Sequence, residues 1–187
     1  ASDPRADCLS VDAGTELLWR FPPRRLEAEA IRDNMLLISG LLNEKMYGPG
    51  FLLFEPNSNY ARNWIQKVKV EETDFRRMIY NMRIRMEQDS VFGAFDCPDG
   101  GQSAPNRSRS TTPLQALNLY NSPFTVKMAE AFAKRLLEQN NNNAKQALAV
   151  AFESIFGRIP ENKERDAFLV LWDCLLYTSD AADELSS

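Results

Sequence analysis

The 187 residues, 44% hydrophobic and 26% charged, include no apolar run near the ~20 residues that a membrane-spanning helix requires, which excludes such a helix. With 22 basic and 26 acidic residues the net charge is -4, so the chain lacks the basic signature of proteins that bind nucleic acid or anionic membranes. It has no histidine, which excludes Ser-His-Asp and Cys-His catalysis, histidine ligands of zinc and a CxxCH haem site.

The chain begins with ASDPRADCLS, which has neither the basic start nor the apolar run of a signal peptide and lacks an initiator methionine. We therefore expect the natural start to lie upstream. The next segment, RRLEAEAIRDNMLLISGLLNEKM, follows Pro22 and Pro23 and predicts a long helix, since Arg25 and Glu29 are i,i+4 partners and apolar residues recur at helical spacing. These apolar residues are Ala28, Ile31, Met35, Ile38 and Leu42.

This first helix is apolar nearly all round in its second half, so we expect it at the centre of the core. Gly40 costs roughly 1 kcal/mol in a helix interior, and we expect another backbone to cross closely there. The turn Gly48-Pro49-Gly50 ends the helix. Two short β-like runs, at 51–54 and 65–70, then predict a small β-hairpin or irregular lobe near residues 51–70.

A second amphipathic helix is predicted from Thr73, a suitable N-cap, to about residue 86. Its apolar positions are Phe75, Met78, Ile79, Met82 and Met86, and the methionines are interpreted as core filling rather than as metal ligands. The stretch VFGAFDCPDGGQSAPN at 91–106 is rich in Gly and Pro and predicts a loop.

The remaining helices are marked by their ends. Thr112-Pro113 and Ser122-Pro123 each combine an N-cap residue with proline at the first helical position, which predicts one short helix and one long helix. The four asparagines at 140–143 predict a loop, another helix runs to Gly157 as its C-cap, and a last helix begins after Pro160. The predicted fold is mostly α, a helical domain of about five helices.

The end of the chain contains CLLYTSDAADE, which resembles the conceptual translation of a sequencing adapter. We interpret residues 174–187 as adapter read-through and residues 1–173 as a single, incomplete helical domain. Without the three acidic residues of the tail, 23 acidic residues face 22 basic ones and the net charge becomes -1. We expect Leu175, Leu176 and Tyr177 to lie away from the core or merely to extend the last helix.

Cys8 and Cys97 are the cysteines outside this tail, and no CxxC motif occurs. Their separation in sequence leaves open whether they pair or remain free thiols.

Charged residues on the predicted loops are the candidates for a binding site. Asp96 and Asp99 in FDCPD, with Glu55 in FEPN, would form a paired-carboxylate glycosidase site if they converge in space, although Asp next to Pro and Gly commonly serves turn formation. Arg107 and Arg109 follow a few residues later. We predict that one of them pairs with Asp96 or Asp99 and fastens the loop to the start of the helix at Pro113; the alternative is that these arginines bind a ligand.

Several ordered motifs together resemble the domain of unknown function 1553, over roughly residues 6–172. They are RRLEAEAIRD, the Gly-Pro-Gly turn, FEPNSNY, FRRMIY, FDCPD, RSRSTTPLQALNLYNSPF and FGRIPENKERDAF. The resemblance implies the C-terminal part of an exported, planctomycete-type, cytochrome-c-linked protein, here truncated at both ends as in a metagenomic fragment. It implies an extracytoplasmic or periplasmic location and allows haem in a missing upstream domain. Because the chain has neither histidine nor a CxxCH motif, we expect no cofactor in this fragment.

Two functions follow from the resemblance and the residues. The leading one is a non-catalytic helical module that docks other domains of the same parent chain or carbohydrate. The alternative is a polysaccharide-active hydrolase or lyase that uses Asp96, Asp99 and Glu55. The resemblance carries no catalytic residue over to this chain, and neither a metal nor nucleic acid is expected as a partner.

Overall fold

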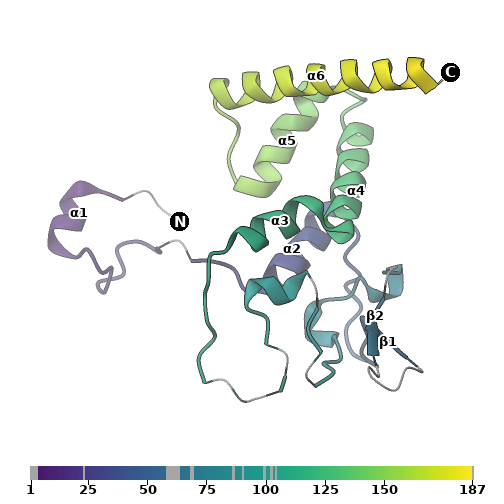
Figure 1. The fold of residues 1–187 in the computed structure, drawn as a ribbon. Helices are drawn as coiled ribbons and strands as arrows, with labels where there is room; N and C mark the ends of the chain where they lie inside the picture. The colour runs from purple at the N-terminus through teal and green to yellow at the C-terminus, as the bar shows by residue number, and fades with distance from the viewer. Residues whose placement is uncertain are drawn as a thin grey trace.

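The computed structural model describes residues 4–22, 24–57, 64–67, 70–85, 87–89, 91–98, 100–101, 103 and 105–186. Within them the protein is mostly α with one small sheet, as predicted (Figure 1). The α-helices are α1 (Ala6–Val11), α2 (Ala28–Ser39), α3 (Pro113–Asn121), α4 (Pro123–Gln139), α5 (Ala144–Phe156) and α6 (Asn162–Ser186). Three short 3-10 helices are η1 (Glu72–Asp74), η2 (Met78–Tyr80) and η3 (Phe92–Phe95).

The sheet is an antiparallel hairpin of β1 (Phe54–Pro56) and β2 (Trp64–Gln66), with Glu55 opposite Ile65. This confirms the small hairpin expected near residues 51–70. The hairpin lies near α2, whereas α5 and α6 lie at the other end of the molecule, and α4 connects the two regions (Figure 1).

The core is built around α2, as its apolar character predicted. Leu36 of α2 packs with Phe75 and with Met128 of α4. Ala28, at the start of α2, packs with residues of η3 and the chain that follows it: Phe92, Phe95 and Cys97. A third cluster beside the hairpin consists of Phe51, Leu53 and Phe54. The helix thus joins α4 to the loop segments on its other sides.

Helix α2 is shorter than predicted, because it begins at Ala28 and ends at Ser39. Gly40 is its C-cap, with φ 80° in the left-handed region that glycine adopts readily. It is exposed, and its neighbour is the side chain of Arg135 rather than another backbone. The expectation of a close backbone crossing was therefore wrong, since the residue ends the helix instead of lying inside it.

The second amphipathic helix, predicted from Thr73, is absent from the described part of that segment. Residues 72–74 and 78–80 form 3-10 turns, Phe75 and Met78 are buried, and Ile79 is 79% exposed. Met86, also counted in the predicted stripe, lies outside the described residues.

Partners distant in sequence explain this difference. The backbone N–H of Asn43 donates to the carbonyl of Phe75 at 2.9 Å, and that of Phe51 donates to the carbonyl of Tyr80 at 3.0 Å. The N–H of Met82 returns a bond to the carbonyl of Phe51 at 2.8 Å. In an α-helix, these backbone groups would form hydrogen bonds within their own segment. Here they pair with residues 43 and 51 instead, and this pairing replaces the helix that periodicity alone predicts.

The helices marked by proline and glycine were predicted correctly. Pro113 opens α3 and Pro123 opens α4, where the Ser122 hydroxyl accepts a hydrogen bond from the N–H of Thr125 at 3.1 Å. Asn143 caps α5, and Gly157 ends it with φ 67°. The loop predicted at 91–106 contains the four-residue η3, whose two phenylalanines are buried.

Helix α6 packs against α5 through an edge-to-face contact of Phe152 and Phe168, whose ring centroids lie 5.4 Å apart. The helix continues through the segment interpreted as read-through, and Leu175 is 58% exposed. This agrees with the expectation that the tail extends the last helix without entering the core; the side chains of Leu176 and Tyr177 lie outside the described residues. The adapter origin of the tail stays a prediction.

Among the described residues, no helix combines the length and apolar character of a membrane span, and no group of three or more acidic or cysteine side chains is placed to hold a metal ion. Cys8 and Cys97 are both free thiols.

Candidate functional site

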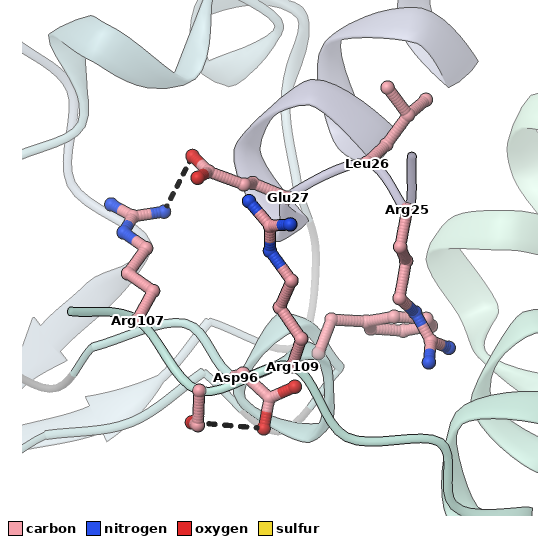
Figure 2. A pocket seen from close by; sticks show the side chains of 8 residues that line it. Arg25, Leu26, Glu27, Asp96, Arg107 and Arg109 are labelled. Carbon is pink, nitrogen blue, oxygen red and sulfur yellow. Dashed lines mark hydrogen bonds and ion pairs between the residues drawn. The ribbon is translucent and has the colours of Figure 1, made fainter. Parts of the chain in front are cut away.

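The segment 107–110 places charged and hydroxyl side chains on opposite sides. Arg107 and Arg109 both point toward the residues that precede α2 (Figure 2). Ser108 and Ser110 instead contact Asp96, on the other side of the segment. This alternation is typical of extended backbone, in which successive side chains point to opposite faces. It separates the arginines from the carboxylate that the sequence assigned to them.

Arg107 binds the two glutamates at the start of α2. Its Nη1 lies 3.0 Å from Glu27 Oε2 and 2.8 Å from Glu29 Oε2, and its Nη2 lies 3.0 Å from Glu29 Oε1. The pair with Glu29 is therefore bidentate. Burial alone would raise the pKa of Glu29, but the hydrogen bond from Arg107 and the nearby charges of Arg107 and Arg83 bring it below its usual value.

Asp96 is held by the serines rather than by an arginine. Its Oδ2 accepts the backbone N–H of Ser110 at 2.6 Å, and its Oδ1 accepts the Ser110 hydroxyl at 2.9 Å. The hydrogen bond from the Ser110 N–H is the main reason that the pKa of Asp96 lies below its usual value. The loop is thus fastened near the start of α3, but neither Arg107 nor Arg109 binds Asp96; the predicted alternative partner, Asp99, lies outside the described residues.

Arg25 and Gln115 complete this junction, and sequence reasoning missed this role for both. Arg25 donates to the Ser110 carbonyl, to the Gln115 side-chain oxygen and, at 2.6 Å, to the Thr111 hydroxyl. Gln115 is buried and donates to the carbonyl of Ala94 at 2.9 Å. A signal for Gln115 was present, because glutamine three residues after the N-cap Thr112 matches a capping box, and its oxygen accepts the Thr112 N–H at 3.3 Å.

Glu55 and Asp96 belong to different elements, since Glu55 lies on β1 and Asp96 follows η3. Glu55 is exposed on the hairpin and is not among the residues that line the pocket beside Asp96. Asp99 lies outside the described residues. The hypothesis of a paired-carboxylate site, which needs two carboxyl groups that flank one bond, stays a prediction.

Cys97 lies behind this network. Its thiol is buried and accepts a hydrogen bond from Arg83 Nη2 at 2.8 Å. Burial raises the pKa of the thiol above its usual value, although Arg83 acts in the opposite sense. The thiol therefore remains protonated at neutral pH and serves as a small core side chain.

Two cavities adjoin the network. A small pocket of about 20 Å³ lies between the residues that precede α2 and the segment 107–109 (Figure 2). A larger open groove of about 680 Å³ runs along the outer face of α2 and shares Glu27 and Arg107 with the pocket. Its other charged side chains include Glu29, Asp33, Arg77 and Arg83.

A family model described as "Protein of unknown function (DUF1553)" matches residues 1–172. The chain belongs to the DUF1553 family. The motifs that predicted this membership span nearly the same range. Comparisons with curated proteins and with solved structures found no match. All residues of the arginine and carboxylate network lie within the DUF1553 match, so the network is part of the family domain.

Proposed function

We propose that this DUF1553 domain is a non-catalytic helical module that docks other domains of an exported, cytochrome-c-linked parent protein. Its charged side chains support this, because they hold the fold together: Arg107 is engaged by two glutamates and Asp96 by two serines. A CxxCH haem site needs a histidine, and this domain contains none. The haem expected in such a parent therefore belongs to an upstream domain. The extracytoplasmic location follows from the same parentage.

The observation that carries the proposal is the apolar character of α6. Residues 168–172 read Phe-Leu-Val-Leu-Trp, five consecutive apolar side chains that occupy all sides of the helix. A helix that is apolar all round normally lies in an interior. Here α6 packs against α5, and Val170 remains 70% exposed.

The apolar surface continues onto α5 and the turn that follows it. The exposed large apolar residues in this region are Ile155, Phe156, Ile159, Phe168, Val170, Leu171 and Trp172. Exposed apolar side chains gathered in one region mark protein interaction sites. The occupant that we assign is another domain of the parent chain, since a domain tethered to the same polypeptide binds at high effective concentration and needs little intrinsic affinity.

The test is association with the remaining domains of the parent, produced as a separate chain. We expect a complex by size-exclusion chromatography with light scattering, and a Val170→Asp variant should weaken it by about tenfold or more, because a carboxylate would be buried without a partner. Tyr120→Asp is the matched control, since Tyr120 is 86% exposed and belongs to α3, which lies apart from α6 in Figure 1. Absence of a complex, or equal binding by Val170→Asp, would contradict the proposal.

A further inference from the structure

The small pocket at the start of α2 contains more cations than anions. Its lining carries three guanidinium groups, from Arg25, Arg107 and Arg109, and two carboxylates, from Glu27 and Asp96. In Figure 2 the guanidinium groups of Arg107 and Arg109 both extend from one segment toward the same side of the pocket, and Arg25 reaches down from the residues before α2.

Each of the two carboxylates already has a hydrogen-bond partner. Glu27 binds Arg107 at 3.0 Å, and Asp96 accepts the N–H of Ser110 at 2.6 Å. Arg25 makes three hydrogen bonds, all of them to neutral oxygen atoms. Because a guanidinium has five N–H donors, further donors remain on Arg25. Arg109 is exposed and makes no hydrogen bond or ion pair with any residue that the structure describes. Within the described part of the chain, Arg109 is thus the arginine of this pocket that has no bound partner.

The start of α2 adds to this positive character. Glu27 is the N-cap of α2, yet its side chain makes no capping hydrogen bond, because its carboxylate is turned to Arg107. The first N–H groups of a helix carry partial positive charge and attract anions when no side chain caps them. Leu26 and Glu27 at this helix start both line the pocket.

We propose that this pocket binds a single oxyanion group, a carboxylate or a sulfate, held by Arg109 beside the uncapped start of α2. The cavity of about 20 Å³ holds little more than one water molecule, which needs roughly 10–15 Å³ by the same measure, so we expect only an oxygen atom of the oxyanion to enter it. Guanidinium groups match carboxylate and sulfate oxygens with paired hydrogen bonds. The remainder of a larger ligand would extend into the groove that shares Glu27 and Arg107. This site is independent of the docking surface on α6.

The experiment is a titration of the isotope-labelled 187-residue chain with sodium sulfate and, separately, sodium glucuronate, followed by amide chemical shifts. Sodium chloride keeps the ionic strength constant, so general screening does not change. We expect saturable shifts at residues 25–27 and 107–109. An Arg109→Gln variant should bind about tenfold more weakly, because a charge-assisted hydrogen bond is lost.

Arg85→Gln is the matched control, since Arg85 is exposed, lies outside the pocket and undergoes the same loss of charge. It should bind within about twofold of the unaltered chain, because it removes only a distant charge. Tighter binding of glucuronate than of sulfate would support an acidic sugar as the source of the oxyanion, and equal binding would support a free small anion. Saturation by neither anion, or equal loss in Arg109→Gln and Arg85→Gln, would overturn the proposal.

Discussion

At the scale of single residues, Arg32 is one of the largest fully buried side chains of the protein's described part. It is only 1% exposed, and its guanidinium donates to the carbonyls of Asp74 at 2.6 Å and Arg76 at 2.8 Å. The ring centroids of Phe51 and Phe124 lie 5.1 and 5.7 Å from the guanidinium carbon. Burial lowers the pKa of Arg32 to about 10, so the residue remains charged at neutral pH.

We expect Arg32→Met to destabilise the protein by about 2–5 kcal/mol, because two buried carbonyls lose their donor at roughly 1–3 kcal/mol each. The free energy of unfolding in urea, followed by circular dichroism, measures this. Arg85→Met is the control, since Arg85 is exposed and should change stability by no more than about 0.5 kcal/mol. Equal effects of the two substitutions would show that the hydrogen bonds of Arg32 contribute little.

At the scale of elements, α2 and α5 stop where glycine adopts a left-handed conformation. Gly40 ends α2 with φ 80° and Gly157 ends α5 with φ 67°. Their surroundings differ. A methyl group at Gly157 would meet nothing within 4 Å, whereas one at Gly40 would lie 3.0 Å from Arg135 Nη1. Arg135 also donates to the carbonyl of Ile38 near the end of α2, so Gly40 is tied to the α2–α4 contact.

We therefore expect Gly157→Ala to cost about 1 kcal/mol, the strain of a side chain at positive φ. Gly40→Ala should cost about 1 kcal/mol more than this, because Arg135 must also move from its hydrogen bond. Thermal unfolding of both variants provides the comparison. A smaller loss for Gly40→Ala than for Gly157→Ala would show that Arg135 adjusts freely.

At the scale of the whole molecule, the core and the last helix are separate in their packing. The buried clusters involve α2, α4, the hairpin and the segments 70–75 and 91–97. Helix α6 contacts α5, at the far end of the molecule from the hairpin (Figure 1). The end of α6 therefore contributes little to the cooperative core.

We expect a chain truncated after Asp173 to unfold at the same urea midpoint as the 187-residue chain, because Leu175 is exposed and the removed segment extends only one helix. The helical circular dichroism signal should fall in proportion to the residues removed. A loss of stability above about 1 kcal/mol would mean that residues 174–187 pack onto the domain, and would count against their interpretation as read-through.

The sequence by itself determined the features that depend on neighbouring residues. Proline after Thr112 and Ser122 marks two helix starts, and Gly157 marks a helix end, because capping is completed within about four residues. The helical segment at α2 and the existence of the hairpin were also readable from local patterns, although Ala28 is the one residue of the predicted stripe among the side chains that α2 buries. The ordered motifs also predicted the DUF1553 family, which the family model confirmed over residues 1–172.

Only the tertiary structure decided which distant groups meet. The apolar spacing after Thr73 is helical, yet residues 43 and 51 take the backbone groups that a helix would use. Arg107 lies 11 positions from Asp96 but binds Glu29, which is 78 positions away. The reason is that successive side chains of the segment 107–110 point to opposite faces, and this turns Arg107 toward α2. Local spacing sets which conformations a segment favours, whereas long-range hydrogen bonds and charges select among them, and these depend on the positions of all elements at once.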